Sequence, residues 1–97
     1  MDKLNHVAIV VADVESAAQW YLSSFNCELI HIEVTEALIK FENLQVQLVL
    51  PSQVPPHLAF EREDAASFGE LQPQKSGVNS TYLSDPSGNI VEIVEKK

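Results

Sequence analysis

The chain has 97 residues, of which 45% are hydrophobic, and carries a formal net charge of −8 at pH 7. A chain of this length forms one domain with a modest core. Its negative charge repels phosphate backbones and anionic lipid surfaces, so we expect neither nucleic acid nor a membrane as a partner. The single cysteine, Cys27, cannot form an internal disulfide, and no long apolar segment opens the chain. These two features favour a cytoplasmic location.

The first half of the chain predicts the element order β-α-β-β-β. Residues 4–11 are apolar except at Asn5 and His6 and predict a central strand. Asp13 is suited to cap a helix, and one apolar stripe at helical spacing predicts that helix from Val14 to Phe25. Asn26 is expected to end it in the left-handed conformation. Three strands are then predicted at residues 27–34, 37–41 and 44–50.

A proline-rich connector, residues 51–56, separates the two halves. The second half opens with a predicted strand at 57–61, and Asp64 is expected to cap a short helix that reaches about Glu70. Residues 72–77 are expected to form a loop. The chain then ends in a predicted hairpin of strands 78–84 and 89–95, joined by a turn rich in Asp, Pro, Gly and Asn.

The two halves resemble each other in sequence. His6 and His57 are each followed by an apolar residue, an alanine and another apolar residue, and each lies seven residues before a capping aspartate. The segment around Gln47 is echoed by the segment around Glu92. The histidines are 51 residues apart, whereas Gln47 and Glu92 are 45 apart, so the second copy is shorter. Its short helix accounts for the difference.

This repeat predicts a metal site. If a pseudo-twofold axis relates the two copies, His6 and Gln47 face His57 and Glu92 across a cleft. Glu92 lies between aliphatic residues on its own strand face, where a carboxylate needs a cation or hydrogen-bond donors. Two imidazoles, an amide and a carboxylate suit a divalent transition metal with positions left open for a ligand. His31 lies outside the repeat and is interpreted as an ordinary strand histidine.

The sequence resembles the vicinal oxygen chelate superfamily, which includes glyoxalase I, methylmalonyl-CoA epimerase, extradiol dioxygenases and fosfomycin-resistance enzymes. The resemblance covers nearly the whole chain, residues 1–97, as a single glyoxalase-like domain. It is carried by residues 4–9, the helix with Trp20 and Tyr21, residues 45–48, residues 57–60 and, most specifically, residues 82–92. It implies an α+β fold of two βαβββ modules that form curved mixed sheets around a cleft. The modules would be residues 1–51 and a shortened one at 57–97.

The resemblance also implies roles for individual residues. His6, His57 and Glu92 match the metal triad of the family, and Gln47 matches a fourth ligand position. The metal would be a divalent ion such as Ni, Zn, Co, Mn or Fe. Glu92 and Glu36 are the candidates for moving a proton, Glu36 through a match to a catalytic carboxylate of the epimerase.

Three functions are compatible with this resemblance. The first is a metal-dependent lyase or isomerase that chelates vicinal oxygens of a small substrate and stabilises an enediolate or enolate. The second is an Fe(II) extradiol-type dioxygenase. The third is a metal-free protein of the bleomycin-resistance type that sequesters a ligand, although metal-free members generally lack the triad. Members of the superfamily commonly pair, so a homodimer is expected.

Overall fold

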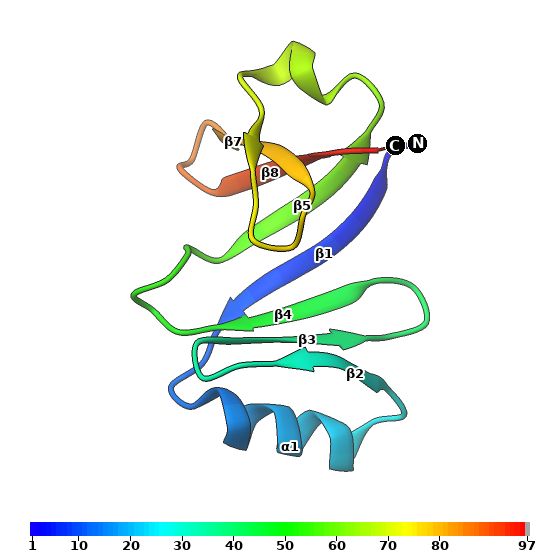
Figure 1. Cartoon of the computed structure of the whole chain (residues 1–97), viewed down its shortest axis with the longest axis vertical. Coiled ribbons are helices and arrows are strands. Elements are labelled where there is room, and N and C mark those ends of the chain that lie inside the picture. The colour runs from blue at the N-terminus through cyan, green and yellow to red at the C-terminus, as the bar shows by residue number, and fades with distance from the viewer. Residues whose placement is uncertain (97) are drawn as a thin grey trace. The chain divides into compact units, whose positions relative to one another are not determined.

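The structure is a computed structural model and describes residues 1–96. The chain forms two compact units. The first unit comprises residues 6–56, and the second comprises residues 1–5 together with the residues from His57 on. Each unit has a mixed sheet with one helical segment (Figure 1). Neither helical segment in residues 1–96 has the length and apolar content needed to cross a membrane.

The first unit confirms the predicted β-α-β-β-β order. Strand β1 (Lys3–Val10) is followed by helix α1 (Val14–Ser24) and then by strands β2 (Glu28–Ile32), β3 (Glu36–Lys40) and β4 (Gln45–Val49). The strands lie in the order β2-β3-β4-β1, with β1 parallel to β4 and the other pairs antiparallel. Figure 1 shows α1 running alongside these strands.

Helix α1 begins and ends for identifiable reasons. Asp13 is its N-cap and accepts hydrogen bonds from the backbone N–H groups of Glu15 and Ser16, as predicted. The expectation for Asn26 is wrong, because no non-glycine residue among those described has a positive φ. The helix instead ends at Phe25 in an extended conformation, and the Phe25 N–H donates to the Tyr21 carbonyl. The core lies between α1 and the sheet and contains Val14, Ala18, Ala37, Ile39 and Leu48.

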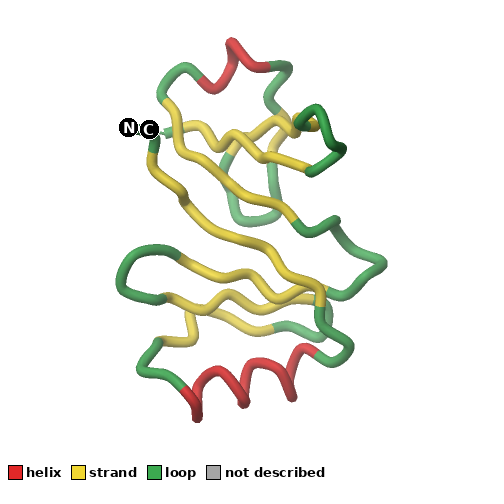
Figure 2. The backbone as a smooth tube through the Cα atoms, turned by 180° about the vertical axis from the view of Figure 1, so that it is seen from behind, coloured by secondary structure: helices red, strands yellow, loops and turns green. Residues whose placement is uncertain are grey.

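The second unit has the same plan with a reduced helix. It contains strand β5 (His57–Arg62), the 3₁₀ helix η1 (Ala65–Phe68) and strands β6 (Gln72–Pro73), β7 (Asn79–Ser84) and β8 (Ile90–Glu95). The strand order is β5-β8-β7-β6, with β5 parallel to β8. Figure 2 shows η1 as a short helical segment and α1 as a longer one, so the second copy is shortened at its helix, as the sequence predicts.

Two expectations for the second unit need correction. The segment that follows Asp64 is a 3₁₀ helix that ends at Phe68, not a helix that reaches Glu70. Asp64 makes no side-chain cap, because its carboxylate binds the Arg62 guanidinium instead. The predicted loop at 72–77 begins with β6, which pairs with the start of β7. A two-residue strand at the end of a sheet tolerates Pro73, which lacks an N–H donor.

The sequence repeat reappears in the strand register. In the first unit, Gln47 pairs with Ala8, two residues after His6. In the second unit, Glu92 pairs with Ala59, two residues after His57. Each unit therefore presents a histidine and a polar residue at equivalent places on two parallel strands.

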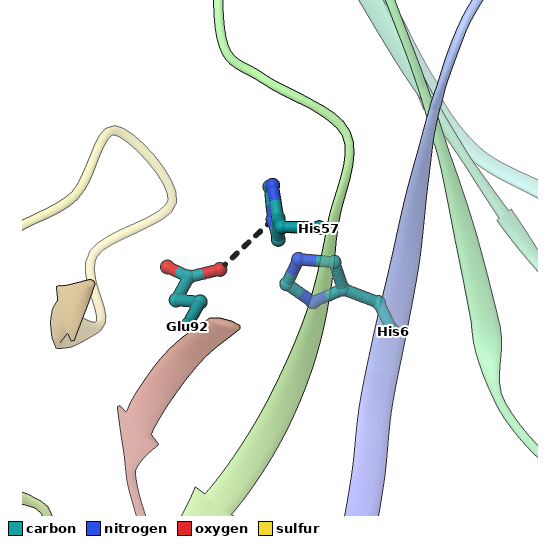
Figure 3. Close-up of side chains that lie close together, drawn as sticks. All are labelled: His6, His57 and Glu92. Atoms are coloured by element: carbon teal, nitrogen blue, oxygen red, sulfur yellow. Dashed lines mark ion pairs between the residues drawn. The ribbon is translucent and has the colours of Figure 1, made fainter. Parts of the chain in front are cut away.

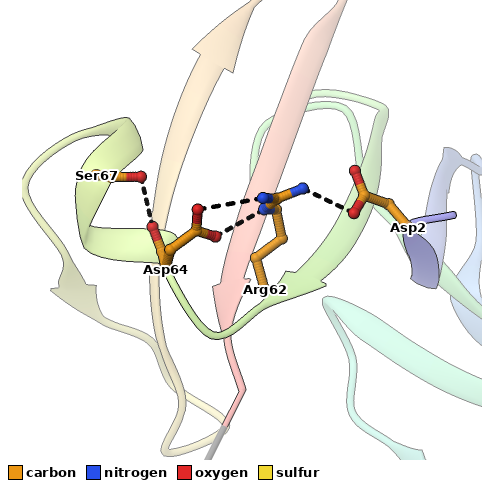
Figure 4. A network of polar contacts seen from close by, with 4 residues as sticks. All are labelled: Asp2, Arg62, Asp64 and Ser67. Atoms are coloured by element: carbon orange, nitrogen blue, oxygen red, sulfur yellow. Dashed lines mark hydrogen bonds and ion pairs between the residues drawn. The ribbon is translucent and has the colours of Figure 1, made fainter.

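Arg62 fixes residues 1–5 to the rest of the second unit. Its guanidinium donates to Asp2 at 2.7 Å and to both carboxylate oxygens of Asp64 at 2.7 and 3.1 Å (Figure 4). Hydrogen bonds to Asp64 and Asp2 raise the pKa of Arg62, and the bond from Arg62 lowers the pKa of Asp64. The Ser67 hydroxyl donates to the Asp64 carbonyl. Asp2, Arg62 and Asp64 line a surface cavity of about 420 Å³ that neither His57 nor Glu92 lines.

The predicted turn between the last two strands is confirmed and is organised by Asp85. The Asp85 carboxylate accepts bonds from the backbone N–H groups of Ser87 and Asn89 and from the Asn89 amide, all within 2.9 Å. Gly88 adopts φ +89°, which glycine reaches without strain. The Asn89 side chain and the backbone N–H donors lower the pKa of Asp85 below its ordinary 3.8. The folded turn thus favours the ionised carboxylate.

This lowered pKa predicts an acid-dependent contribution to stability. A group with a depressed folded pKa stabilises the fold above its unfolded value, here near 3.8, and loses that contribution as the pH falls through the folded value. Asp85→Asn should therefore lower the denaturant midpoint at pH 7, and the gap from wild type should narrow below pH 3.8. Glu70→Gln, at an exposed carboxylate outside the turn, is the control. A gap that stays constant with pH would contradict the assignment.

Candidate metal centre

The side chains of His57 and Glu92 form a buried contact in the second unit. His57 Nε2 lies 3.2 Å from Glu92 Oε1, and the two side chains are only 1% and 6% exposed (Figure 3). Glu92 pairs with Ala59, which lies two residues after His57. Because side chains alternate along a strand, His57 and Glu92 lie on the same face of the sheet. Glu92 is therefore buried, and an imidazole meets its carboxylate there.

Two hydroxyl groups on β7 also form hydrogen bonds with the Glu92 carboxylate. Ser80 is fully buried, and its hydroxyl donates to Glu92 Oε2 at 2.7 Å. Tyr82 pairs with Glu92 across the strands, and its ring lies edge-on to the His57 imidazole at 5.6 Å between centroids. Burial, followed by the charge of Glu92 and a hydrogen bond to it, raises the pKa of Tyr82, so its hydroxyl stays protonated. Glu92 is thus held from two strands.

The first unit places Gln47 beside Glu36. The Gln47 amide Nε2 donates to Glu36 Oε2 at 2.7 Å, in a partly buried position between β3 and β4. Because a carboxylate only accepts hydrogen bonds, this contact fixes which end of the amide faces Glu36. The amide oxygen, the end suited to a cation, is the remaining end. His31, on β2, lies 3.8 Å from the other oxygen of Glu36 and is partly exposed. The structure thus places His31 next to a candidate catalytic residue.

The candidate ligands of each unit lie on the sheet face away from its helical segment. In the first unit Leu48 packs against α1, so its neighbour Gln47 points to the opposite face. His6, on β1, shares that face, because it lies two residues before Ala8, the partner of Gln47. In the second unit the Arg62 guanidinium lies over the ring of Phe68 in η1. Strand alternation places His57, five residues earlier, on the other face.

Within the second unit the donor set fits a divalent transition metal. An imidazole nitrogen and a carboxylate oxygen converge in a buried place, and both are ligand types that such ions accept. Glu92 also has a hydrogen-bonded oxygen, as ligating carboxylates commonly have. The structure therefore brings together two of the four predicted ligands, His57 with Glu92, and joins a third, Gln47, to Glu36.

The sequence interpretation missed Ser80 and Tyr82. Both lie on the strand that precedes Glu92 along the chain, at alternate positions that share the face of Glu92. Their counterparts in the first half are Glu36 and Leu38, which pair with Val49 and Gln47 on the equivalent strands. The side chains differ between the halves, and the last hairpin is one residue longer, so matching residue types at a fixed offset could not find them.

Comparison with known proteins gives one family match and several similar folds. A family model described as the Glyoxalase/Bleomycin resistance protein/Dioxygenase superfamily matches residues 3–70. That range includes His6, Gln47 and His57, whereas Glu92 lies beyond it. A search of curated proteins found no match.

Solved structures resemble this chain over nearly its whole length. A hypothetical protein from Bacillus halodurans C-125 is 19% identical, with a TM-score of 0.76, and the match covers 99% of this chain and 95% of that one. A variant of Streptomyces coelicolor methylmalonyl-CoA epimerase, in complex with 2-nitronate-propionyl-CoA, is 20% identical at TM-score 0.75, over 97% and 96%. A glyoxalase/bleomycin resistance protein/dioxygenase superfamily member from Vibrio splendidus 12B01 is 8% identical at TM-score 0.75, over 99% and 100%. At these identities the likeness is one of fold.

Proposed function

Because the chain belongs to the glyoxalase/bleomycin resistance protein/dioxygenase superfamily, we propose that it is a metal-dependent lyase or isomerase acting on a small molecule with vicinal oxygens. The observation that carries the proposal is the buried pair of His57 and Glu92, 3.2 Å apart. A carboxylate and an imidazole held together away from water are expensive to keep as a purely structural feature. A metal ligand role explains why both occur at repeated positions.

His6, Gln47, His57 and Glu92 are the proposed ligands, two from each half. When bound, a divalent cation supplies the positive charge that polarises vicinal oxygens and stabilises an enolate or enediolate. The register equivalence of His6 with His57 and of Gln47 with Glu92 supports a shared task for all four. The contact between the Gln47 amide nitrogen and Glu36 supports the amide oxygen as the ligand atom.

Glu36 is the proposed proton-transfer group. Both oxygens of Glu92 are engaged, one by His57 and one by Ser80, which suits a ligand better than a base. Glu36 is more accessible, with its side chain 20% exposed, and it is oriented by Gln47. A general base must lie within hydrogen-bond reach of the proton that it takes. The place of Glu36 beside a proposed ligand supports it as that base.

Metal analysis of protein purified without chelators tests the proposal. We expect about one equivalent of a divalent metal per chain, or stoichiometric uptake on titration with Co²⁺, Ni²⁺, Zn²⁺ or Mn²⁺. Proton exchange at carbon next to a carbonyl, followed by NMR in D₂O with candidate substrates, then tests the chemistry. Failure to bind any of these metals would overturn the proposal in favour of ligand sequestration. Oxygen uptake with catechols and Fe(II) would instead indicate the dioxygenase alternative.

We further propose that the protein is a homodimer. Strand β2 is at one end of the strand order in the first unit, and its apolar residues Leu29, Ile30 and Ile32 are 36–45% exposed. An exposed strand with apolar side chains favours association. Sedimentation equilibrium would measure the mass of the particle in solution.

A further inference from the structure

The two halves repeat a contact between their last two strands. In the first unit Gln47 on β4 bonds to Glu36 on β3, and in the second unit Glu92 on β8 bonds to Ser80 on β7, each at 2.7 Å. The geometry is also equivalent. Glu36 pairs with the residue two positions after Gln47, and Ser80 pairs with the residue two positions after Glu92. Both contacts are therefore diagonal contacts between antiparallel strands, on the face that carries the candidate ligands.

The hydrogen bond between Ser80 and Glu92 has a defined donor and acceptor. The hydroxyl is the donor and Glu92 Oε2 is the acceptor, at 2.7 Å. Ser80 is fully buried, and Glu92 is only 4% exposed, so water competes little for either group. The bond therefore fixes the rotation of the carboxylate, whose other oxygen, Oε1, is turned toward His57 Nε2.

We propose that Ser80 is a positioning residue that directs Glu92 to bind metal through the single oxygen Oε1. The inference rests on the proposed metal site. Ser80 and Glu36 then have the same role. Each binds one end of a ligand side chain, Glu92 or Gln47, so that the other end faces the metal. A carboxylate held in this way gives one ligand atom in place of two and leaves a coordination position for substrate.

The experiment compares Co²⁺ binding by wild type, Ser80→Ala and Ser84→Ala. Ser84 is the matched control, because it lies on the same strand but is exposed, and its hydroxyl donates to the Asp85 carbonyl. Loss of an outer partner of a metal ligand weakens binding by about 10–100-fold, which is the loss expected for Ser80→Ala. Isothermal titration measures the affinity, and the visible spectrum of bound Co²⁺ reports the coordination. Thermal melts of the metal-free proteins establish that each variant is folded at the temperature used.

Each outcome decides the inference. Weaker Co²⁺ binding by Ser80→Ala, with an altered cobalt spectrum and a normal Ser84→Ala protein, supports it. A purely structural role for Ser80 would lower the melting temperature but leave the affinity and the spectrum unchanged, and that result overturns the inference while the proposed function stands. Absence of Co²⁺ binding by wild type overturns both.

Discussion

Replacing His57 with alanine is expected to abolish stoichiometric metal binding. His57 is the histidine whose imidazole lies against the buried Glu92 carboxylate, with an exposed fraction of 1%. Losing a ligand should weaken binding by more than the roughly 100-fold that loss of an outer partner can cost. The measurement is the dissociation constant for Co²⁺ or Ni²⁺ by titration calorimetry, with metal content after dialysis as an independent check.

His31→Ala is the matched control for this experiment. His31 is also a strand histidine, but its side chain is 42% exposed and it lies outside the repeat, so its loss should change the metal affinity far less than the loss of His57 does. Removing one partner of a buried carboxylate can also cost several kcal/mol of folding stability. Thermal melts of the metal-free His57→Ala protein separate lost ligation from lost folding. Unchanged metal occupancy in folded His57→Ala would remove His57 from the site.

The repeat explains why much of the fold was predictable. The spacing of His6 and His57 before their aspartates, together with the similar strands around Gln47 and Glu92, indicates two copies of one unit, and the parallel pairing in both units has the same register. Periodicity also located α1, whose apolar stripe packs on the sheet. Local features that depend on competing partners were less predictable. Asp64 could cap a helix or bind Arg62, and only the folded chain shows that the guanidinium is the partner it takes.

The candidate site also contains some residues that the sequence predicts and others that only the structure reveals. Glu92 stands out in sequence because a carboxylate between aliphatic residues on one strand face needs a partner, and the structure supplies His57. Ser80 carries no such signal, since a serine on a strand is unremarkable until its neighbour across the sheet is known. The contact of Gln47 with Glu36 likewise depends on the register of β3 and β4. Residues that bind a metal have distinctive chemistry, whereas residues that orient them are recognised only from tertiary contacts.

Replacing Glu36 with glutamine is expected to reduce turnover while metal binding stays intact. General acid–base catalysis contributes about 10²–10⁴-fold, so kcat should fall within that range for the substrate that wild type turns over. The glutamine carbonyl can still accept the hydrogen bond from the Gln47 amide, which Glu36 now receives at 2.7 Å. The variant therefore keeps the contact that orients Gln47 and loses only the ability to take a proton. Solvent deuterium exchange by NMR measures the rate, and titration calorimetry measures the metal affinity.

Two further variants make this result specific. Glu36→Ala removes both the base and the acceptor for Gln47, so it should lose turnover and also weaken metal binding, unlike Glu36→Gln. Glu28→Gln changes an exposed carboxylate at the start of β2 and should alter neither quantity. If Glu36→Gln exchanged protons as fast as wild type, Glu36 would be a positioning residue for Gln47 alone. Glu92 would then be the one remaining carboxylate of the two proposed to transfer a proton, despite its contacts with His57 and Ser80.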